Sequence, residues 1–195
     1  EILRCLVGSE MCIRDSIDLV QIVLETYKVR DGNIRLYKEN ILLKGFIKEI
    51  IEEMQPIAQK TNNTLEFIQQ RDIRVYADRI QLKRVIKNLI QNAISYGEPN
   101  FPIEVSIGEI PQYIVIKVKD YGAGISKTDI DKIFNKYYSA AKKFRKIGTG
   151  LGLYLALQII KSHNGELSVE SEEGNFTEFT IKLPAVMNIN LHYGE

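Results

Sequence analysis

Three segments in the second half of the chain alternate between apolar and polar residues, and this alternation restricts the possible folds more than any other feature. The segments are "PIEVSIGE", "YIVIKVKD" and "TEFTIKLP", which begin at residues 102, 113 and 177. Because successive side chains of a strand point to opposite faces, each segment would bury one face. One-sided burial is typical of a largely antiparallel sheet with helices on a single face. The sequence therefore predicts an α/β fold, a two-layer sandwich with a mixed, mostly antiparallel sheet.

Apolar residues at helical spacing predict the helices that cover this sheet or precede it. These helices are expected at 17–29, through Phe46 to Ala58, at 79–96 and at 150–163. Asp78 is a suitable N-cap for the helix at 79–96, and Ser126 for a short helix that ends at Phe134. Further strands are predicted at 63–70, 73–77 and 166–171, and a short extended piece follows residue 33.

We divide the chain into four parts. Residues 1–16 contain both cysteines, Cys5 and Cys12, and show no period, so we interpret them as a non-native leader. Residues 17–33 form a helix fragment, residues 34–184 the main domain, and residues 185–195 a tail. The net charge is only +1, and no apolar run reaches the roughly 18 residues of a membrane span. These features argue against nucleic-acid and membrane contact, and the cysteine-free main domain fits a cytoplasmic location.

Asp120 is the next residue on the apolar face after Val118, at the end of a predicted strand. An unpaired buried carboxylate costs several kcal/mol, so Asp120 requires a donor. Capping of the turn "YGAGIS" is the commoner role of such an aspartate. The apolar neighbours instead favour an acceptor for a ligand, such as an exocyclic amine. Thr177 begins the buried face of the last strand and could add a hydroxyl to the same floor.

Two asparagines, Asn88 and Asn92, lie four residues apart on one flank of the apolar stripe of the 79–96 helix, with Tyr96 beside them. A single asparagine there would be read as a solvated surface residue. Because asparagine is a mediocre helix former, the pair indicates a function. Two amides beside a pocket could hold a hydrated Mg²⁺, which prefers oxygen ligands.

The stretch from Lys132 to Gly165 contains many basic residues and no Asp or Glu. Such a stretch can be merely solvated, but its field also suits an anion of several charges. Within it, "GTGLG" precedes a predicted helix, where glycines allow close backbone approach and the helix N-terminus favours phosphate. The sequence is not the P-loop, which needs Gly-Lys-Ser/Thr, and the protein-kinase triplets are absent.

Together, these motifs resemble those of one family, the ATP-binding catalytic domain of sensor histidine kinases, within the gyrase, chaperone and mismatch-repair ATPases. "NLIQNAISY" is similar to its asparagine box, "DYGAG" to its first glycine box, "IFNKYY" to its phenylalanine box and "GTGLGL" to its second glycine box. The resemblance covers about Ile41 to Pro184. Residues 17–33 resemble the end of the dimerisation and phosphotransfer hairpin. The resemblance implies ATP and Mg²⁺ as cofactors and a histidine as phosphoryl acceptor.

The resemblance also implies a nucleotide site. Asp120 would accept from the adenine amine, Asn92 would hold Mg²⁺, and Gly148 to Leu153 would cradle the phosphates. Phe134 and the two tyrosines after it would hinge a lid, whose basic residues would reach the triphosphate. The implied residues are Asn88, Asn92, Tyr96, Asp120, Gly122, Gly124, Ile125, Tyr137, Tyr138, Lys142, Lys143, Arg145, Gly148, Thr149, Gly150, Leu151, Gly152, Leu153 and Thr177.

Three features depart from the family pattern. Ser95 stands where many relatives carry a lysine, and Phe176 interrupts the usual Gly-x-Gly-Thr before Thr177. No histidine has a phosphoacceptor context. His163 ends a helix and is expected to interact with its dipole as a cation, and His192 lies in the tail. We therefore expect an N-terminally truncated kinase with no acceptor histidine and no catalytic residue of its own.

Two alternatives remain open at this point. A hydrolase of the same superfamily would place a glutamate, as the general base for water, where Asn88 stands, so transfer to a positioned nucleophile is favoured. A nucleotide-binding scaffold without turnover is the other. The implied partners are the phosphoacceptor hairpin of the full-length protein, a response-regulator receiver domain and a second copy of the full-length protein. A membrane anchor elsewhere in the full-length protein stays open.

Overall fold

A computed structural model describes residues 34–68, 71–138 and 150–185, and every structural statement below concerns these residues. The predicted leader, the 17–33 helix fragment and nearly all of the tail lie outside them. The predicted division into four parts is therefore not tested. Within the described residues, no helix combines the length and the apolar character that a membrane span requires.

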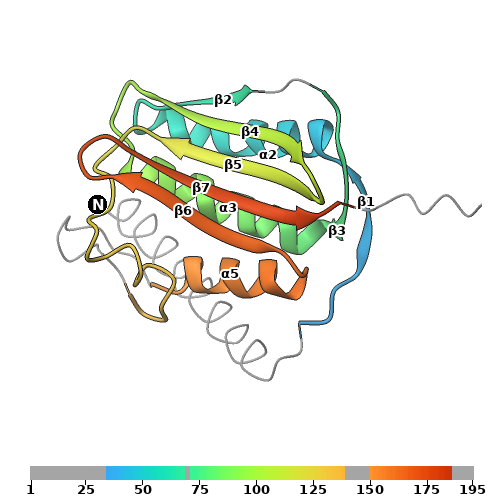
Figure 1. Cartoon of the computed structure of the whole chain (residues 1–195). Helices are drawn as coiled ribbons and strands as arrows, with labels where there is room; N and C mark the ends of the chain where they lie inside the picture. The colour runs from blue at the N-terminus through green and yellow to red at the C-terminus, as the bar shows by residue number, and fades with distance from the viewer. Residues whose placement is uncertain (1–33, 69–70, 139–149, 186–195) are drawn as a thin grey trace, which may run out of the picture.

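A five-stranded sheet forms one layer of the domain, and the helices lie along one of its faces (Figure 1). The strand order is β2-β4-β5-β7-β6. Only the β2–β4 pair is parallel, and the other three pairs are antiparallel, so the predicted mixed sheet is confirmed. The strands are β2 (Thr64–Ile68), β4 (Pro102–Ile110), β5 (Tyr113–Asp120), β6 (Glu166–Glu172) and β7 (Phe176–Pro184).

The apolar face of the sheet and the facing sides of the helices form one core. The alternating residues of β4, β5 and β7 are buried as predicted, for example Val105, Ile116 and Ile181. Such burial stabilises each side chain by about 1.5–3 kcal/mol relative to exposure. The helices are α2 (Leu43–Gln59), α3 (Arg79–Tyr96) and α5 (Gly152–Ser162).

A second, two-stranded sheet lies at the side of the domain. It consists of β1 (Lys38–Leu42) and β3 (Arg74–Asp78), which pair antiparallel. Asp78 ends β3 and caps α3, because its carboxylate accepts from the N–H of Gln81 at 3.0 Å. The same carboxylate accepts from the N–H of Tyr37 at 2.8 Å. The predicted cap is confirmed, and it also anchors the chain that enters β1.

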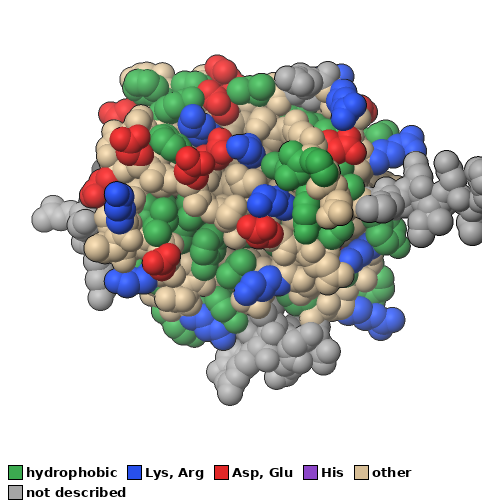
Figure 2. Space-filling model, in the orientation of Figure 1, with side chains coloured by type: hydrophobic (Ala, Val, Ile, Leu, Met, Phe, Trp, Pro, Cys, Tyr) green, Lys and Arg blue, Asp and Glu red, His purple; other side chains and the backbone are tan. Residues whose placement is uncertain are grey.

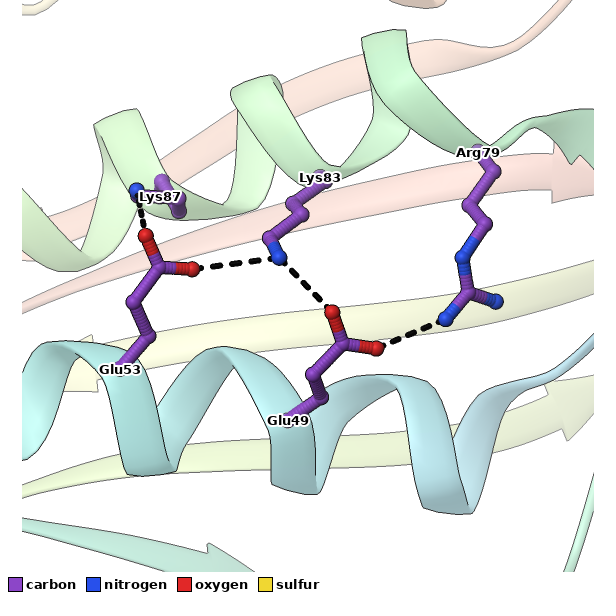
Figure 3. Close-up of polar contacts among 5 residues, drawn as sticks. All are labelled: Glu49, Glu53, Arg79, Lys83 and Lys87. Carbon is purple, nitrogen blue, oxygen red and sulfur yellow. Dashed lines mark hydrogen bonds and ion pairs between the residues drawn. The ribbon is translucent and has the colours of Figure 1, made fainter.

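Helices α2 and α3 are joined on their solvent side by a row of ion pairs (Figure 3). Glu49 accepts from Arg79 at 2.7 Å and from Lys83 at 2.8 Å. Glu53 pairs with Lys83 at 3.2 Å and with Lys87. The hydrogen bond from Lys83 lowers the pKa of Glu49, and the bond from Lys87 lowers the pKa of Glu53. These side chains are 30–49% exposed, so water and salt screen the ion pairs, which act mainly on helix alignment.

The predicted short helix between Ser126 and Phe134 is wrong. The carbonyl of Ser126 accepts from the N–H groups of Asp129 and Ile130, but the following bonds are turns that reach only three residues back. The side chains explain this, because Ile133 is buried and Phe134 meets the Phe179 ring edge-on at 6.4 Å. These packing contacts hold the segment as a series of turns, without the continuous bonds to the fourth preceding residue that define an α-helix.

His163 follows α5 and is not the cationic dipole partner that the sequence suggests. Its side chain is 3% exposed. Nε2 accepts from the N–H of Asp78 at 2.9 Å, and Nδ1 donates to the carbonyl of Ile159 at 2.8 Å. Burial lowers the pKa of His163, with a smaller lowering from Lys38, although Ile159 and Asp78 act in the opposite direction. The ring is therefore a neutral link between the end of α5 and the start of α3.

Candidate functional site

Three buried side-chain atoms of the described residues have no hydrogen-bond partner, and all three belong to residues of the predicted nucleotide site. They are Nδ2 of Asn88, Nδ2 of Asn92 and Oδ1 of Asp120. A buried polar atom without a partner costs about 1–3 kcal/mol, so native proteins contain few of them. Their concentration on two neighbouring elements, α3 and β5, indicates a place prepared for a polar ligand.

Asp120 lies at the end of β5, directly opposite Thr177 of β7. Both side chains are buried, at 3% and 5% exposure, on the helix-covered face of the sheet. The predicted orientation of these two residues is therefore confirmed. Burial raises the pKa of Asp120 to about 7. A ligand that donates to the carboxylate would favour its charged form and remove part of this cost.

The loop after β5 is fixed by the end of α3. Gly97 and Gly122 form an isolated antiparallel bridge. A Cβ atom at Gly122 would lie 2.1 Å from the carbonyl oxygen of Tyr96, so no larger residue fits there. This contact keeps the backbone after Asp120 close to the helix that carries the two asparagines.

The turn between β6 and β7 holds the same loop from the other side. The N–H of Gly174 donates to the carbonyl of Ala123, and the N–H of Ile125 donates to the hydroxyl of Ser171, both at 2.9 Å. Gly124 has a φ of +63°, and a Cβ atom there would lie 2.1 Å from the carbonyl oxygen of Glu172. The sequence reasoning missed Ser171, although a serine on the apolar face of a strand was a usable signal.

The second glycine motif lies beside Asn88. A Cβ atom at Gly152, the first residue of α5, would lie 2.3 Å from Oδ1 of Asn88. The start of α5 is thus in contact with the asparagine side of α3. The positive end of the helix dipole is there, which favours an anion. Leu151 is buried and Leu153 half-buried, so this turn is anchored in the core.

The described parts of the predicted lid meet at its base. The N–H of Tyr137 donates to the carbonyl of Gly150 at 3.0 Å. Gly150 has a φ of +66°, and a Cβ atom there would lie 2.6 Å from the backbone of Tyr137. Tyr138 packs against the core, and its hydrogen bond to Asp129 raises its pKa. The predicted residues Lys142, Lys143, Arg145, Gly148 and Thr149 lie outside the described residues.

A cavity of about 590 Å³ adjoins this site at the C-terminal end of α3. Tyr96 and Gly122 line it, together with residues 61, 63, 94, 97–99, 123 and 174. It does not include the two asparagines or Asp120, so the cavity and the predicted site share only one border. Asn63, at its wall, already donates to the carbonyls of Glu98 and Phe101.

The donor set near Asn92 can be compared with what Mg²⁺ requires. No group of three or more His, Cys, Asp or Glu among the described residues could hold a metal ion. Mg²⁺ bound with a nucleotide commonly takes one or two protein oxygens, and phosphates and water supply the others. Rotation of the unpartnered Asn92 amide would present its oxygen to such an ion. The residues therefore fit a nucleotide-bound Mg²⁺ and not an all-protein metal cage.

Comparisons with known proteins agree with this geometry. Residues 77–187 match the family model described as the histidine kinase-, DNA gyrase B- and HSP90-like ATPase. The chain is 32% identical over 174 residues to the sensor histidine kinase WalK of Bacillus subtilis, covering 86% of this chain and 28% of that protein. The chain thus spans just over a quarter of the length of this relative.

Solved structures show the same fold. The catalytic domain of the histidine kinase ThkA, in a nucleotide-free form, superposes with a TM-score of 0.68 at 28% identity, covering 76% of this chain and 96% of that one. The Acinetobacter baumannii histidine kinase AdeS gives a TM-score of 0.75 at 23% identity, over 88% of this chain and 79% of that chain. From the matched model, the relatives and the architecture, the chain belongs to the family of histidine kinase-, DNA gyrase B- and HSP90-like ATPases.

Proposed function

We propose that this domain binds Mg²⁺–ATP and is the catalytic core of a two-component sensor histidine kinase, transferring the γ-phosphoryl group to a histidine on the dimerisation hairpin. One observation carries the proposal. The unpartnered buried atoms of the described residues belong to Asn88, Asn92 and Asp120, the residues to which the family resemblance assigns contacts with Mg²⁺–ATP. A bound nucleotide with its ion would supply partners to all three.

Each described part of the site has a task in this proposal. Asp120 accepts from the amine of adenine, and the backbone from Gly122 to Ile125 borders the ring. Asn92 contributes an amide oxygen to Mg²⁺, which neutralises phosphate charge as the phosphoryl group leaves. The first turn of α5, with Gly152 against Asn88, faces the phosphates with the positive end of its dipole. The lid residues Lys142, Lys143 and Arg145 are proposed to reach the triphosphate, and Gly148 and Thr149 to form part of the phosphate cradle.

The arrangement favours transfer over hydrolysis. Activation of water needs a general base near the metal-binding asparagine, and position 88, one helical turn before it, carries an amide. An amide cannot take a proton from water. Phosphoryl transfer to a nucleophile held in line by a partner needs mainly position and charge neutralisation. The partners in this proposal are the phosphoacceptor hairpin, a response-regulator receiver domain and a second copy of the full-length protein, with this domain in the cytoplasm.

Titration with a fluorescent ATP analogue in the presence of Mg²⁺ tests the nucleotide site. We expect saturable binding to the wild-type chain that excess ATP competes away. Asp120→Asn should raise the Kd by about 10- to 100-fold, because a hydrogen bond to a buried charge contributes about 1.5–3 kcal/mol. Asp131→Asn is the matched control, since Asp131 is an exposed aspartate that follows the same loop. Near-parental binding by Asp120→Asn, or no binding by the wild-type chain, would contradict the proposal.

A further inference from the structure

Ser171 lies on the β6 strand, next to Thr177 and the loop that follows Asp120. Its Oγ contacts three groups: the N–H of Ile125 at 2.9 Å, the carbonyl of Phe176 at 2.6 Å and the hydroxyl of Thr177 at 3.1 Å. Neither the family resemblance nor the comparisons give this serine a role. It is half-buried on the same face of β6 as Leu167 and Val169.

Only one arrangement of protons satisfies all three contacts. The N–H of Ile125 can only donate, and the carbonyl of Phe176 can only accept. Ser171 must therefore give its single proton to Phe176. Its oxygen accepts from Ile125 and, with its other lone pair, from the hydroxyl of Thr177. The proton of Thr177 is thus directed at Ser171, away from the space beside Asp120.

These contacts determine which hydrogen bonds the floor of the nucleotide site, formed by Asp120 and Thr177, can make with a ligand. Thr177 and Asp120 are directly opposite each other on β7 and β5, and both are buried. With its proton engaged by Ser171, Thr177 offers only lone pairs to a ligand in direct contact with it. The ionised Asp120 carboxylate also offers only lone pairs. The floor therefore accepts hydrogen bonds and cannot donate them.

We propose that Ser171 is a positioning residue that sets base specificity: by fixing the proton of Thr177, it makes the floor of the site select a purine with an amine at C6 over one with a carbonyl. The inference rests on the nucleotide site proposed above and adds a determinant to it. An amine presents donors to both acceptors. A carbonyl oxygen would meet lone pairs on both, and a buried mismatch of this kind rejects a ligand strongly.

The test compares ADP with IDP, which differ on one edge of the base: ADP has an amine at C6 and an unprotonated N1, and IDP has a carbonyl at C6 and a proton on N1. Their affinities are measured at pH 8 by calorimetry on the whole chain. Wild type should bind ADP at least about tenfold more tightly than IDP, which corresponds to about 1.4 kcal/mol. Ser171→Ala frees the Thr177 proton to face the ligand. Its ADP affinity should fall and its IDP affinity fall less, so the preference for ADP shrinks.

Three variants separate specificity from loop stability. Ser171→Thr retains a hydroxyl and should restore the wild-type preference. Ser168→Ala makes the same change as Ser171→Ala on the same strand, on its other face, and should change nothing. Thr177→Val should reduce the preference as much as Ser171→Ala, and adding Ser171→Ala to it should have no further effect. If Ser171→Ala does not fold, Thr177→Val tests the premise, because an unchanged preference in that variant overturns the inference.

The outcomes that overturn the inference are distinct from those that overturn the proposed function. An equal loss of ADP and IDP affinity in Ser171→Ala would reduce Ser171 to a support for the loop. An unchanged preference in Thr177→Val would also overturn it, as would equal binding of ADP and IDP by wild type. Absence of binding of either nucleotide by the folded wild-type chain would overturn the proposed function and this inference together.

Discussion

The Asp120 carboxyl opposes folding when no ligand is present. Its pKa rises from 3.8 to about 7 because burial disfavours the charge. A carboxyl with a raised pKa costs no stability below pH 3.8, and the cost grows with pH until it is complete above about pH 7. At about 1.4 kcal/mol for each tenfold change in protonation, the full cost is about 4 kcal/mol at most.

Asp120→Asn should therefore stabilise the ligand-free chain at pH 8 while it impairs nucleotide binding. We expect a gain of about 1–3 kcal/mol, since the buried amide itself lacks partners. The gain should shrink as the pH falls towards 4. Urea unfolding of both proteins across this range measures it, with Asp131→Asn as the control. A constant difference between pH 4 and pH 8 would contradict a titrating, buried Asp120.

His163 should make the folded state less stable in acid, whereas the buried Asp120 carboxyl makes it less stable at higher pH. Its pKa is lowered in the folded state, because burial disfavours the charged ring and Lys38 lies nearby. The unfolded chain then binds more protons than the folded chain. The stability that the neutral His163 ring provides is therefore fully present above about pH 6.5 and is lost progressively below it. Protonation would also prevent Nε2 from accepting from the N–H of Asp78.

His163→Gln isolates this effect from the other titrating groups. At pH 8 the variant should be less stable than wild type by about 1–3 kcal/mol, because the Asp78 N–H loses a well-placed acceptor. The difference in free energy of unfolding between the two proteins should narrow between pH 7 and pH 5, because protonation of the buried ring destabilises only wild type. Urea unfolding at several pH values checks the expectation, and a gap that widens in acid would refute it.

At the residue scale, the sequence predicted side-chain burial correctly where the alternation of a strand determines which face each residue occupies. The alternation of β5 and β7 places Asp120 and Thr177 on the buried face, as predicted. The sequence could not predict the hydrogen-bond partners of Ser171 or the neutral state of His163. The partner of Ser171 in the loop is 46 residues away, and the partner of His163 at the start of α3 is 85 residues away. Contacts at such separation depend on how the elements are assembled.

At the element scale, the contact between the start of α5 and α3 should tolerate no added atom. A Cβ atom at Gly152 would lie 2.3 Å from Oδ1 of Asn88. Gly152→Ala should therefore displace the Asn88 amide, cost about 1–3 kcal/mol of stability and weaken Mg²⁺–ATP binding. Thermal unfolding and ATP titration measure the two effects.

Gly45 in α2 provides the matched control. A Cβ atom there meets nothing within 4 Å. Gly45→Ala should leave ATP binding unchanged and raise stability by up to about 1 kcal/mol, because alanine loses less backbone freedom in a helix. If Gly152→Ala bound ATP as tightly as Gly45→Ala, the start of α5 would not belong to the site.

The elements themselves were largely predictable, but their arrangement was not. The strong periods of α2, α3 and the strands match the structure to within a few residues. The segment after Ser126 was predicted as a helix because Ser126 is a suitable cap, but its backbone forms only turns, and a cap signal does not decide whether a helix continues. The parallel β2–β4 pair and the separate β1–β3 sheet also had no local signature. Tertiary packing determines which strands pair, whereas the alternation of apolar and polar residues in each strand is visible in the local sequence.

At the scale of the whole molecule, the chain should bind Mg²⁺–ATP without phosphorylating itself. His163 is buried, and α5 has 11 residues, so its end lies about 16 Å from the turn proposed to hold the phosphates. His192 lies outside the described residues. Because transfer requires an acceptor held in line, an added hairpin fragment with an acceptor histidine should become labelled instead.

The measurement is transfer of label from γ-labelled ATP, with and without the hairpin fragment. Acid-labile label should appear on the fragment and increase with its concentration. A fragment with the acceptor histidine replaced by glutamine is the control and should stay unlabelled. Label on the chain itself that disappears in His163→Gln would contradict the proposed transfer, and binding without any transfer would favour a nucleotide-binding scaffold.

The open face and the two edges of the sheet bear on the solubility of the domain. Basic and acidic side chains are interspersed with apolar ones over the face turned to the viewer in Figure 2. A net charge of only +1 gives the whole chain little long-range repulsion against its own copies. The outer strand β6, which has a single neighbour, carries Glu166, Glu170 and Glu172. A second copy that added its β6 to this edge would bring carboxylates together, so the charges on β6 oppose edge-to-edge pairing of two copies, and salt should weaken this opposition.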